Sequence, residues 1–256
     1  MSIQRQLQAA ITAQSLPPPS QALLASLTTR NPPPPLPSLL ASARARLLAS
    51  DLTSADTVDT SALAVLPPPP PGRGEEDYLA VPEVKIPADV YVQVLDVENL
   101  SLSRWEQIEQ LELVEKGETT RGREVIRVTA EDDDEQDVAT QSTVSRTQQQ
   151  QQQRGGPGGP NAAAARAGKN ATHRLTVQDY KGRRLHALEL RRIDGIGIGK
   201  TNIGEKILIK AGTAIARGNV LLTPDSCTLL GGKVDAWHKA WVEGRLGRLK
   251  EAVGAQ

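Results

Sequence analysis

A stretch near the middle of the chain is almost free of large apolar side chains, and it limits where a folded core can lie. It contains an acidic run, EDDDEQD, a run of glutamines, and then RGGPGGPNAAAARAGKN, which ends at about residue 171. Such a segment cannot bury enough apolar surface to offset the conformational entropy lost on folding. We therefore predict that residues 130–170 are a disordered insertion and that the core forms on either side of it.

Charge is distributed unevenly, although the formal net charge of the 256 residues is zero. No overall attraction to nucleic acid or membrane is therefore expected. From residue 96 to 137 acidic residues outnumber basic ones 14 to 5, whereas from residue 172 to the end basic residues outnumber acidic ones 15 to 8. The basic C-terminal half suits contact with DNA or with an acidic partner, or it is simply a solvated face.

Residues 1–53 carry apolar side chains at helical spacing, separated by two clusters of prolines. A proline inside a helix costs about 3 kcal/mol, so SLPPPS and NPPPPLP are expected to lie between helices. This pattern predicts a small bundle of three helices. Residues 54–80 include five consecutive prolines and little apolar content, which predicts an extended linker.

From residue 81 the pattern changes to the alternation typical of strands. Val90, Val92 and Val94 predict a first strand, and LSRWEQIEQLELVEKG has loosely helical spacing. Beyond the insertion, which spans about 103–172, four strands are predicted between about 183 and 230, one of them at Ile193–Ile198. Residues 237–256 are predicted to form a C-terminal helix. We therefore expect a mainly β fold, with a closed barrel of five short strands over residues 81–236.

The stretch IDGIGIGKT resembles a phosphate-binding loop but fails the test of spacing. A P-loop requires a glycine five residues before Gly199, and that position is Asp194. The third glycine of a dinucleotide-binding fingerprint would fall on Lys200. We interpret the glycines as backbone features that permit bends or close approach.

The sequence offers no reaction centre. No pair of Cys or His residues has metal-ligand spacing, and the three histidines are isolated from one another. Because Cys227 is the only cysteine, an internal disulfide is excluded. Cys227 is expected to be a small buried residue. No apolar run approaches the roughly 20 residues that span a bilayer, and no signal peptide is expected. We predict a protein that is not an enzyme and needs no cofactor, metal or small-molecule substrate.

A dense set of motifs in the C-terminal half resembles the OB-fold domain of the RecQ-mediated genome instability protein family. The family pattern joins a G-x-K-x-L-I-x-G strand to R-x-G-V-L-L-L-x-P-x-N and then V-L-G-G-x-V-D. This chain matches it over about 35 residues, with Thr223 where a third leucine is common. The matching residues are Gly204, Lys206, Leu208, Ile209, Arg217, Gly218, Val220, Leu221, Leu222, Pro224, Leu229, Leu230, Gly231, Gly232, Val234 and Asp235.

The resemblance implies an OB fold with an N-terminal helical bundle, a long insertion after the first strand and a C-terminal helix. It implies a noncatalytic scaffold that binds type IA topoisomerase III and a RecQ helicase and promotes dissolution of double Holliday junctions. The partner-binding residues are expected to be Lys206, Arg217, Trp105, Ile108, Leu111 and Leu113. Lys206 is expected at the surface, where it either pairs with an acidic partner or faces water, and Lys206→Glu is predicted to weaken topoisomerase binding while leaving the fold intact. The residues expected to have structural roles are Gly195, Gly197, Gly199, Gly231, Gly232, Trp237 and Trp241, with the first three at a hairpin between the second and third strands.

A second hypothesis is an autonomous module that binds single-stranded nucleic acid. OB folds of that kind stack bases on aromatic side chains of the barrel face. The six aromatic residues of this chain all lie outside the four later predicted strands, so DNA contact through the basic C-terminal half is expected to be weak. A nuclear location is implied by the resemblance alone, because paired arginines such as Arg183-Arg184 do not form a clear import signal.

Overall fold

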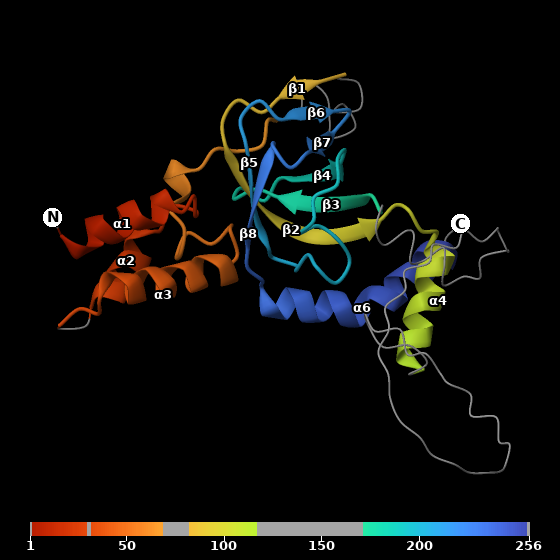
Figure 1. Ribbon diagram of the computed structural model, residues 1–256, viewed down its shortest axis with the longest axis horizontal. Coiled ribbons are helices and arrows are strands. Elements are labelled where there is room, and N and C mark those ends of the chain that lie inside the picture. The colour runs from red at the N-terminus through yellow and green to blue at the C-terminus, as the bar shows by residue number, and fades with distance from the viewer. Residues whose placement is uncertain (1, 30–31, 69–81, 117–170, 255–256) are drawn as a thin grey trace, which may run out of the picture.

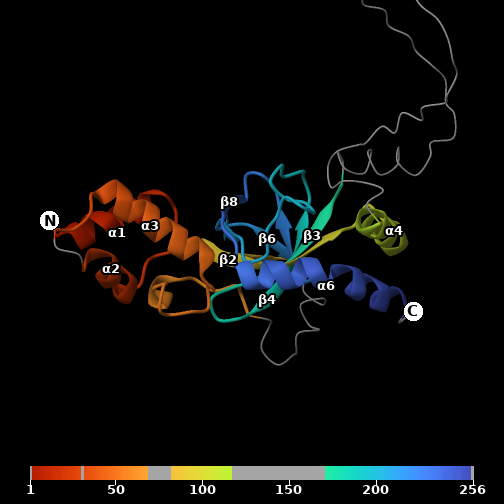
Figure 2. The same ribbon diagram turned by 90° about the horizontal axis from the view of Figure 1, so that it is seen from below.

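The computed structural model describes residues 2–29, 32–68, 82–116 and 171–254, which form three parts in a row (Figure 1). A helical domain lies at one end of a β-barrel. The C-terminal helix runs along the barrel to a short helix at the opposite end (Figures 1 and 2). The predicted insertion at 130–170 lies outside the described residues.

The N-terminal domain consists of three helices that bury leucines against one another. The hydroxyl of Ser20 accepts a hydrogen bond from the backbone N–H of Leu23 at 3.0 Å and so caps the second helix. The fully buried positions include Leu7, Ile11 and Leu47. The helices are α1 (Ile3–Ala13), α2 (Gln21–Thr28) and α3 (Leu36–Ala49).

Part of the segment predicted to be a linker is packed against the protein. Residues 54–68 contain the short 3₁₀ helix η1 (Thr60–Ala62) and bury Val58 and Leu66 completely. Val58 also pairs with Pro19 in an isolated β-bridge. Val58 and Leu63 join the core of the helical domain and Leu66 joins the core of the barrel, which the low apolar content of the segment did not predict. Residues 69–80, the rest of the predicted linker, lie outside the described residues.

Eight strands form one curled sheet in the order β1-β6-β7-β4-β3-β2-β5-β8. All neighbours pair antiparallel except β4 and β7, which are parallel. The strands are β1 (Val84–Lys85), β2 (Val90–Asn99), β3 (His173–Gln178), β4 (Arg184–Glu189), β5 (Lys206–Ile209), β6 (Ala214–Ala216), β7 (Asn219–Leu222) and β8 (Cys227–Gly231).

The sheet closes into a five-stranded barrel because two of its strands are bent. β5 and β6 are the two halves of one bent barrel strand, and β7 and β8 are the two halves of the next. β5 pairs with β8, and β6 pairs with β7. The N–H of Lys210 donates to the carbonyl of Ser226 at 2.9 Å and connects the two ladders. β5 also pairs with β2, and β7 pairs with β4. The five barrel strands, β2, β3, β4, β5–β6 and β7–β8, therefore form a closed ring. This confirms the predicted OB-fold barrel.

The structure corrects the predicted strand at Ile193–Ile198, which is an irregular segment between β4 and β5. The carboxylate of Glu189 accepts from the N–H of Ile193, and the hydroxyl of Thr201 accepts from the N–H of Gly197. These backbone donors are therefore bonded to side chains and not to a neighbouring strand. The strand that the prediction missed is β3. The three glycines consequently follow the third barrel strand and precede the fourth.

A buried polar network joins the helical domain to the barrel. The side-chain amide of Gln93, fully buried on β2, donates to Asp51 at 2.7 Å and to Gln178 at 3.1 Å. Its carbonyl oxygen accepts from the N–H of Leu52 at 2.8 Å. Buried amide groups must be satisfied in this way, because an unmet hydrogen bond in the interior costs about 1 to 3 kcal/mol. Asp51 and Leu52 follow α3, so the network fixes the position of the whole helical domain.

Lys206 lies in the same interior, and its predicted position at the surface is wrong. It is fully buried, and its Nζ donates to the carbonyl of Gly204 at 2.6 Å. Burial lowers the pKa of Lys206 to about 8, and the nearby charge of Asp51 opposes that shift. Lys206 therefore contributes to the joint with the helical domain, and its charge is not presented to solvent.

The end of β8 and the start of the C-terminal helix also contact the helical domain. Gly232 has a φ of 96°, and a Cβ atom there would lie 2.4 Å from the carbonyl oxygen of Leu48. The adjacent N–H of Lys233 donates to that same oxygen at 3.2 Å. The close approach of α3 therefore requires glycine at position 232. Helix α6 (Asp235–Gly254) begins three residues later.

Candidate protein-interaction groove

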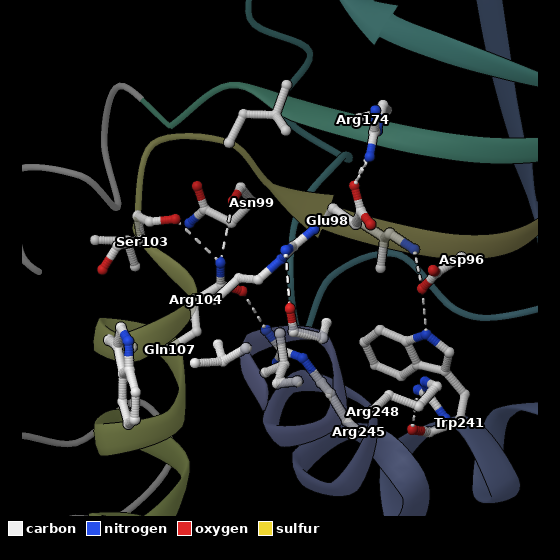
Figure 3. A pocket seen from close by; sticks show the side chains of 17 residues that line it. Asp96, Glu98, Asn99, Ser103, Arg104, Gln107, Arg174, Trp241, Arg245 and Arg248 are labelled. Carbon is white, nitrogen blue, oxygen red and sulfur yellow. Dashed lines mark hydrogen bonds and ion pairs between the residues drawn. The ribbon is translucent and has the colours of Figure 1, made fainter. Parts of the chain in front are cut away.

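A groove opens at the end of the barrel far from the helical domain (Figure 3). Its walls are the end of β2, helix α4 (Arg104–Glu115) and the second half of α6. The lining residues are Asp96, Val97, Glu98, Asn99, Leu100, Leu102, Ser103, Arg104, Trp105, Gln107, Arg174, Trp241, Arg245, Arg248, Leu249, Ala252 and Val253. We refer to the surface formed by these residues as the groove.

Local sequence signals fix helix α4. Ser103 and Glu106 form a capping box, in which the Ser103 hydroxyl accepts from the N–H of Glu106 at 3.1 Å. The Glu106 carboxylate accepts from the N–H of Ser103 at 2.7 Å, and this bond lowers the pKa of Glu106. The buried Gln107 amide donates to the carbonyls of Asn99 and Leu102. The first turn of α4 is thereby tied to the end of β2.

Trp241 holds α6 against the barrel. Its indole Nε1 donates to Asp96 Oδ1 at 2.6 Å, and the same oxygen accepts from the N–H of Val97. Asp96 lies where the register of β2 against β3 shifts between Val94 and Asp96. A bulge of this kind turns a side chain away from its regular direction. Trp241 is 9% exposed and belongs to the barrel core, and Trp237 packs at the edge of that core.

Two arginines of α6 are held by contacts with Trp241 and with α4. The guanidinium carbons of Arg245 and Arg248 lie 5.4 and 5.8 Å from the centre of the Trp241 ring. Arg248 also donates to the carbonyl of Trp241 at 2.8 Å, and Arg245 donates to Gln107 Oε1 at 3.1 Å. These contacts restrict the orientation of both guanidinium groups (Figure 3).

Two further arginines complete the walls of the groove. Arg104 on α4 is exposed and donates to the carbonyl of Ala252 on α6 at 3.3 Å. Arg174 on β3 forms an ion pair with Glu98 on β2 at 2.5 Å. The groove thus contains four arginines and two carboxylates, a formal net charge of +2. Such a surface favours an anionic ligand group.

The predicted residues of α4 have different environments. Trp105 is 64% exposed at the rim of the groove. Ile108 is 3% exposed, so its side chain does not lie on the surface where the expected partner contact would form. Leu111 and Leu113 are half-buried. Because α4 packs against α6, part of its apolar face is covered within this chain. Trp105 is therefore the α4 residue best placed to meet a partner.

Arg217 is not brought together with these residues. It is exposed in the two-residue turn between β6 and β7, where its φ is 45° and that of Gly218 is 77°. A turn with both residues in the left-handed region is the usual connection of a tight hairpin. These strands lie on the side of the barrel opposite α6 (Figure 1).

The glycines differ in what their backbone positions require. A Cβ atom on Gly195 would lie 2.3 Å from Leu229 Cδ1, so the loop approaches β8 closely there. Gly199 has a φ of 80° with open space around it, whereas Gly197 lies beside the His173 ring. Gly231 ends β8 with a φ of 81°. None of these positions requires a phosphate to explain its glycine.

The sequence prediction did not include the basic residues of the groove. Trp241, Arg245 and Arg248 are spaced i, i+4 and i+7, so they share one face of a helix. That spacing was a usable signal for Arg245 and Arg248. Asp96 and Arg104 could not be found in this way, because they reach the groove only through the curvature of β2 and the packing of α4.

Two features are absent from the described residues. Among them, no three His, Cys, Asp or Glu side chains are grouped to hold a metal ion. Likewise, none of the helices in the described ranges combines the length and the hydropathy needed to cross a bilayer. The arrangement of the groove suits recognition by charge and shape.

The fold defines an OB-fold protein with an N-terminal helical domain and a basic groove at the far end of its barrel. The family model for the "RMI1, N-terminal OB-fold domain" matches residues 70–245, and that for the "RMI1, N-terminal helical domain" matches residues 11–55. The chain therefore belongs to the RecQ-mediated genome instability protein 1 family, as its motifs predicted. "RecQ-mediated genome instability protein 1" from Schizosaccharomyces pombe is 26% identical over 202 residues, which cover 78% of this chain and 74% of that protein. Membership supports a scaffold role in genome stability.

Proposed function

We propose that this protein is the noncatalytic scaffold subunit of a complex between a RecQ helicase and type IA topoisomerase III. It binds the topoisomerase through the barrel and helix α4 and promotes the decatenation that dissolves double Holliday junctions. It acts in the nucleus. The observation that carries this proposal is the family match over both the helical and the OB-fold domains.

The scaffold acts physically by shifting a conformational equilibrium of its partner. A protein that binds one state of the topoisomerase gate more tightly than another changes how long that state persists. Helix α4 is suited to such a contact because it stands at the start of the insertion, between β2 and β3, and presents Trp105 to solvent. Arg217 offers a second exposed contact on the barrel.

Affinity purification of the full chain followed by mass spectrometry tests the proposal. We expect topoisomerase III and a RecQ helicase to copurify with the wild-type protein. Trp105→Ala is expected to weaken topoisomerase binding at least several-fold, because exposed aromatic residues dominate many interfaces. Leu190→Ala is the matched control, since Leu190 is also a large exposed apolar residue, at 56%, but lies after β4. Absence of topoisomerase III from the wild-type complex would refute the proposal.

The same protein should bind single-stranded DNA only weakly in the absence of partners. Strands β3–β8 contain no Phe, Tyr or Trp on which a base could stack, and Tyr180, in the turn between β3 and β4, packs against the helical core. Fluorescence anisotropy with an oligonucleotide separates the two hypotheses. Submicromolar affinity that falls steeply with salt would favour an autonomous nucleic-acid-binding module instead.

A further inference from the structure

We propose that the groove between α4 and α6 binds a short acidic segment of a partner protein, one that also carries aliphatic or aromatic anchor residues. The acidic side chains pair with Arg104 and Arg248, and the anchors contact the apolar residues between them. This inference defines the segment by its chemistry and not by the protein that supplies it. It therefore does not rest on the topoisomerase partner proposed above.

Charge provides the first line of support. The two carboxylates of the groove are engaged within the chain, since Asp96 accepts from Trp241 and Glu98 pairs with Arg174. Outside the Glu98–Arg174 pair the groove keeps its net charge of +2, and its exposed guanidinium groups are those of Arg104 on α4 and Arg248 on α6. A carboxylate placed between the two helices would be within the field of both. Guanidinium groups bind carboxylates through paired, directional hydrogen bonds.

Apolar exposure provides the second line of support. The large apolar side chains exposed in the described residues are Leu100, Trp105 and Leu190. Two of these three, Leu100 and Trp105, line the groove. Leu249 and Val253 of α6 add half-buried aliphatic surface to it. Apolar surface framed by polar groups at one place is typical of a site that receives a peptide.

The groove is also organised before any ligand binds. Arg248 is held by the Trp241 ring and carbonyl, and Arg245 by the same ring and by Gln107. Side chains that are already ordered lose less conformational entropy when a ligand pairs with them. An acidic segment therefore gains more from these arginines than it would from freely rotating ones.

A peptide fits this surface better than a nucleic acid does. Helix α4 carries four glutamates, at positions 106, 109, 112 and 115. They would repel a phosphate backbone that ran along the helix, and Glu98 and Asp96 occupy the opposite wall. A peptide with a few carboxylates beside apolar anchors can place its charges only where the arginines lie.

A display selection tests the inference on the isolated full-length chain, with no topoisomerase present. A library of random peptides is selected against the wild-type protein, and enriched peptides are synthesised with a fluorophore for anisotropy. We expect enrichment of Asp and Glu beside aromatic or aliphatic residues. Their affinity should fall at least about tenfold in the Arg104→Glu, Arg248→Glu double variant, because charge reversal at a rim disfavours an anion. The single variant Arg104→Glu, which alters an exposed side chain, keeps the test valid if the double variant is unstable.

The control is Arg44→Glu, which reverses an exposed charge on α3 in the helical domain. It should leave peptide affinity unchanged. Failure to enrich acidic peptides, or equal affinity in wild-type and Arg104→Glu proteins, would overturn the inference. So would strong binding of a dT20 oligonucleotide that is lost in the Arg104→Glu protein, because the groove would then be a nucleic-acid site. None of these outcomes depends on whether topoisomerase III copurifies with the chain.

Discussion

The two ends of the barrel both place basic side chains beside carboxylates, yet burial gives them different roles. At the joint with the helical domain, Lys206 is fully buried among Gly204, Gln93 and Asp51. At the groove, Arg104 and Arg248 are exposed. The joint is closed by its own hydrogen bonds, whereas the groove presents its charges to solvent.

The difference shows that a basic residue cannot be assigned a binding role until its burial is known. A buried charge carries a large desolvation cost, so removing its partners or reversing its sign is strongly destabilising. An exposed charge contributes only about 0 to 1 kcal/mol to stability. Substitutions at the joint should therefore change the fold, and substitutions at the groove should change binding alone.

Reversing the charge of Lys206 should have the largest effect on stability. Lys206→Glu places a carboxylate beside the carbonyl of Gly204 and near Asp51 in the interior. We expect the free energy of unfolding to fall by at least about 4 kcal/mol, or the protein to be insoluble. Urea denaturation followed by circular dichroism measures this. A near-native midpoint would show that Lys206 can turn out to solvent and would restore its predicted role at the surface.

Gly232→Ala should have the next largest effect, because it separates α3 from the barrel. The added Cβ atom would lie 2.4 Å from the Leu48 carbonyl at a φ of 96°, so we expect a loss of more than about 3 kcal/mol. Gly231→Ala is the matched control. It has a similar φ of 81° but no atom within 4 Å, so it should cost only about 1 kcal/mol. Equal losses in the two variants would mean that backbone strain, and not contact with α3, sets the cost.

The stability of the joint should also depend on pH through Lys206. Its pKa is about 8 in the folded state and 10.5 when unperturbed, so the unfolded chain holds more protons between those values. Stability should therefore rise with pH across this window, by at most about 3 kcal/mol from this group. The raised pKa values of Tyr91 and Cys227 act in the opposite direction.

The contribution of Lys206 is obtained by difference. Lys206→Met retains Tyr91 and Cys227, so subtracting its urea-derived free energies from those of the wild type at pH 7.5 and pH 10 isolates the lysine. An identical pH dependence in both proteins would contradict a buried, charged Lys206 at neutral pH.

Much of this fold could be predicted from local patterns. The alternation of Val90, Val92 and Val94 identified the first barrel strand, and proline clusters separated the three N-terminal helices. The motif around Arg217 and Gly232 indicated the family. These signals are local because strand alternation and helix breaking depend on near neighbours.

The errors share one cause, which is that burial depends on distant parts of the chain. Lys206 is the polar residue beside Ile207 in a strand pattern, but its partner on β2, Gln93, binds Asp51 and Leu52 of a distant segment, and all of β5 is buried. The isoleucines at 193, 196 and 203 are buried in a loop, because side chains of Glu189 and Thr201 satisfy its backbone. The groove requires β2, α4 and α6 to meet. No pattern within one segment could show these contacts.

The smallest effect on stability is expected for substitutions in the groove, where the charges are exposed. Arg104→Ala removes an exposed guanidinium whose hydrogen bond to the Ala252 carbonyl is 3.3 Å long. We expect the free energy of unfolding to change by less than about 0.5 kcal/mol, because exposed charged contacts contribute little. Urea denaturation measures this change. Lys206→Ala, measured in the same way, is the comparison and should lose far more unfolding free energy. A loss above about 1.5 kcal/mol would mean that Arg104 holds α4 against α6, and the groove would then be part of the structural framework.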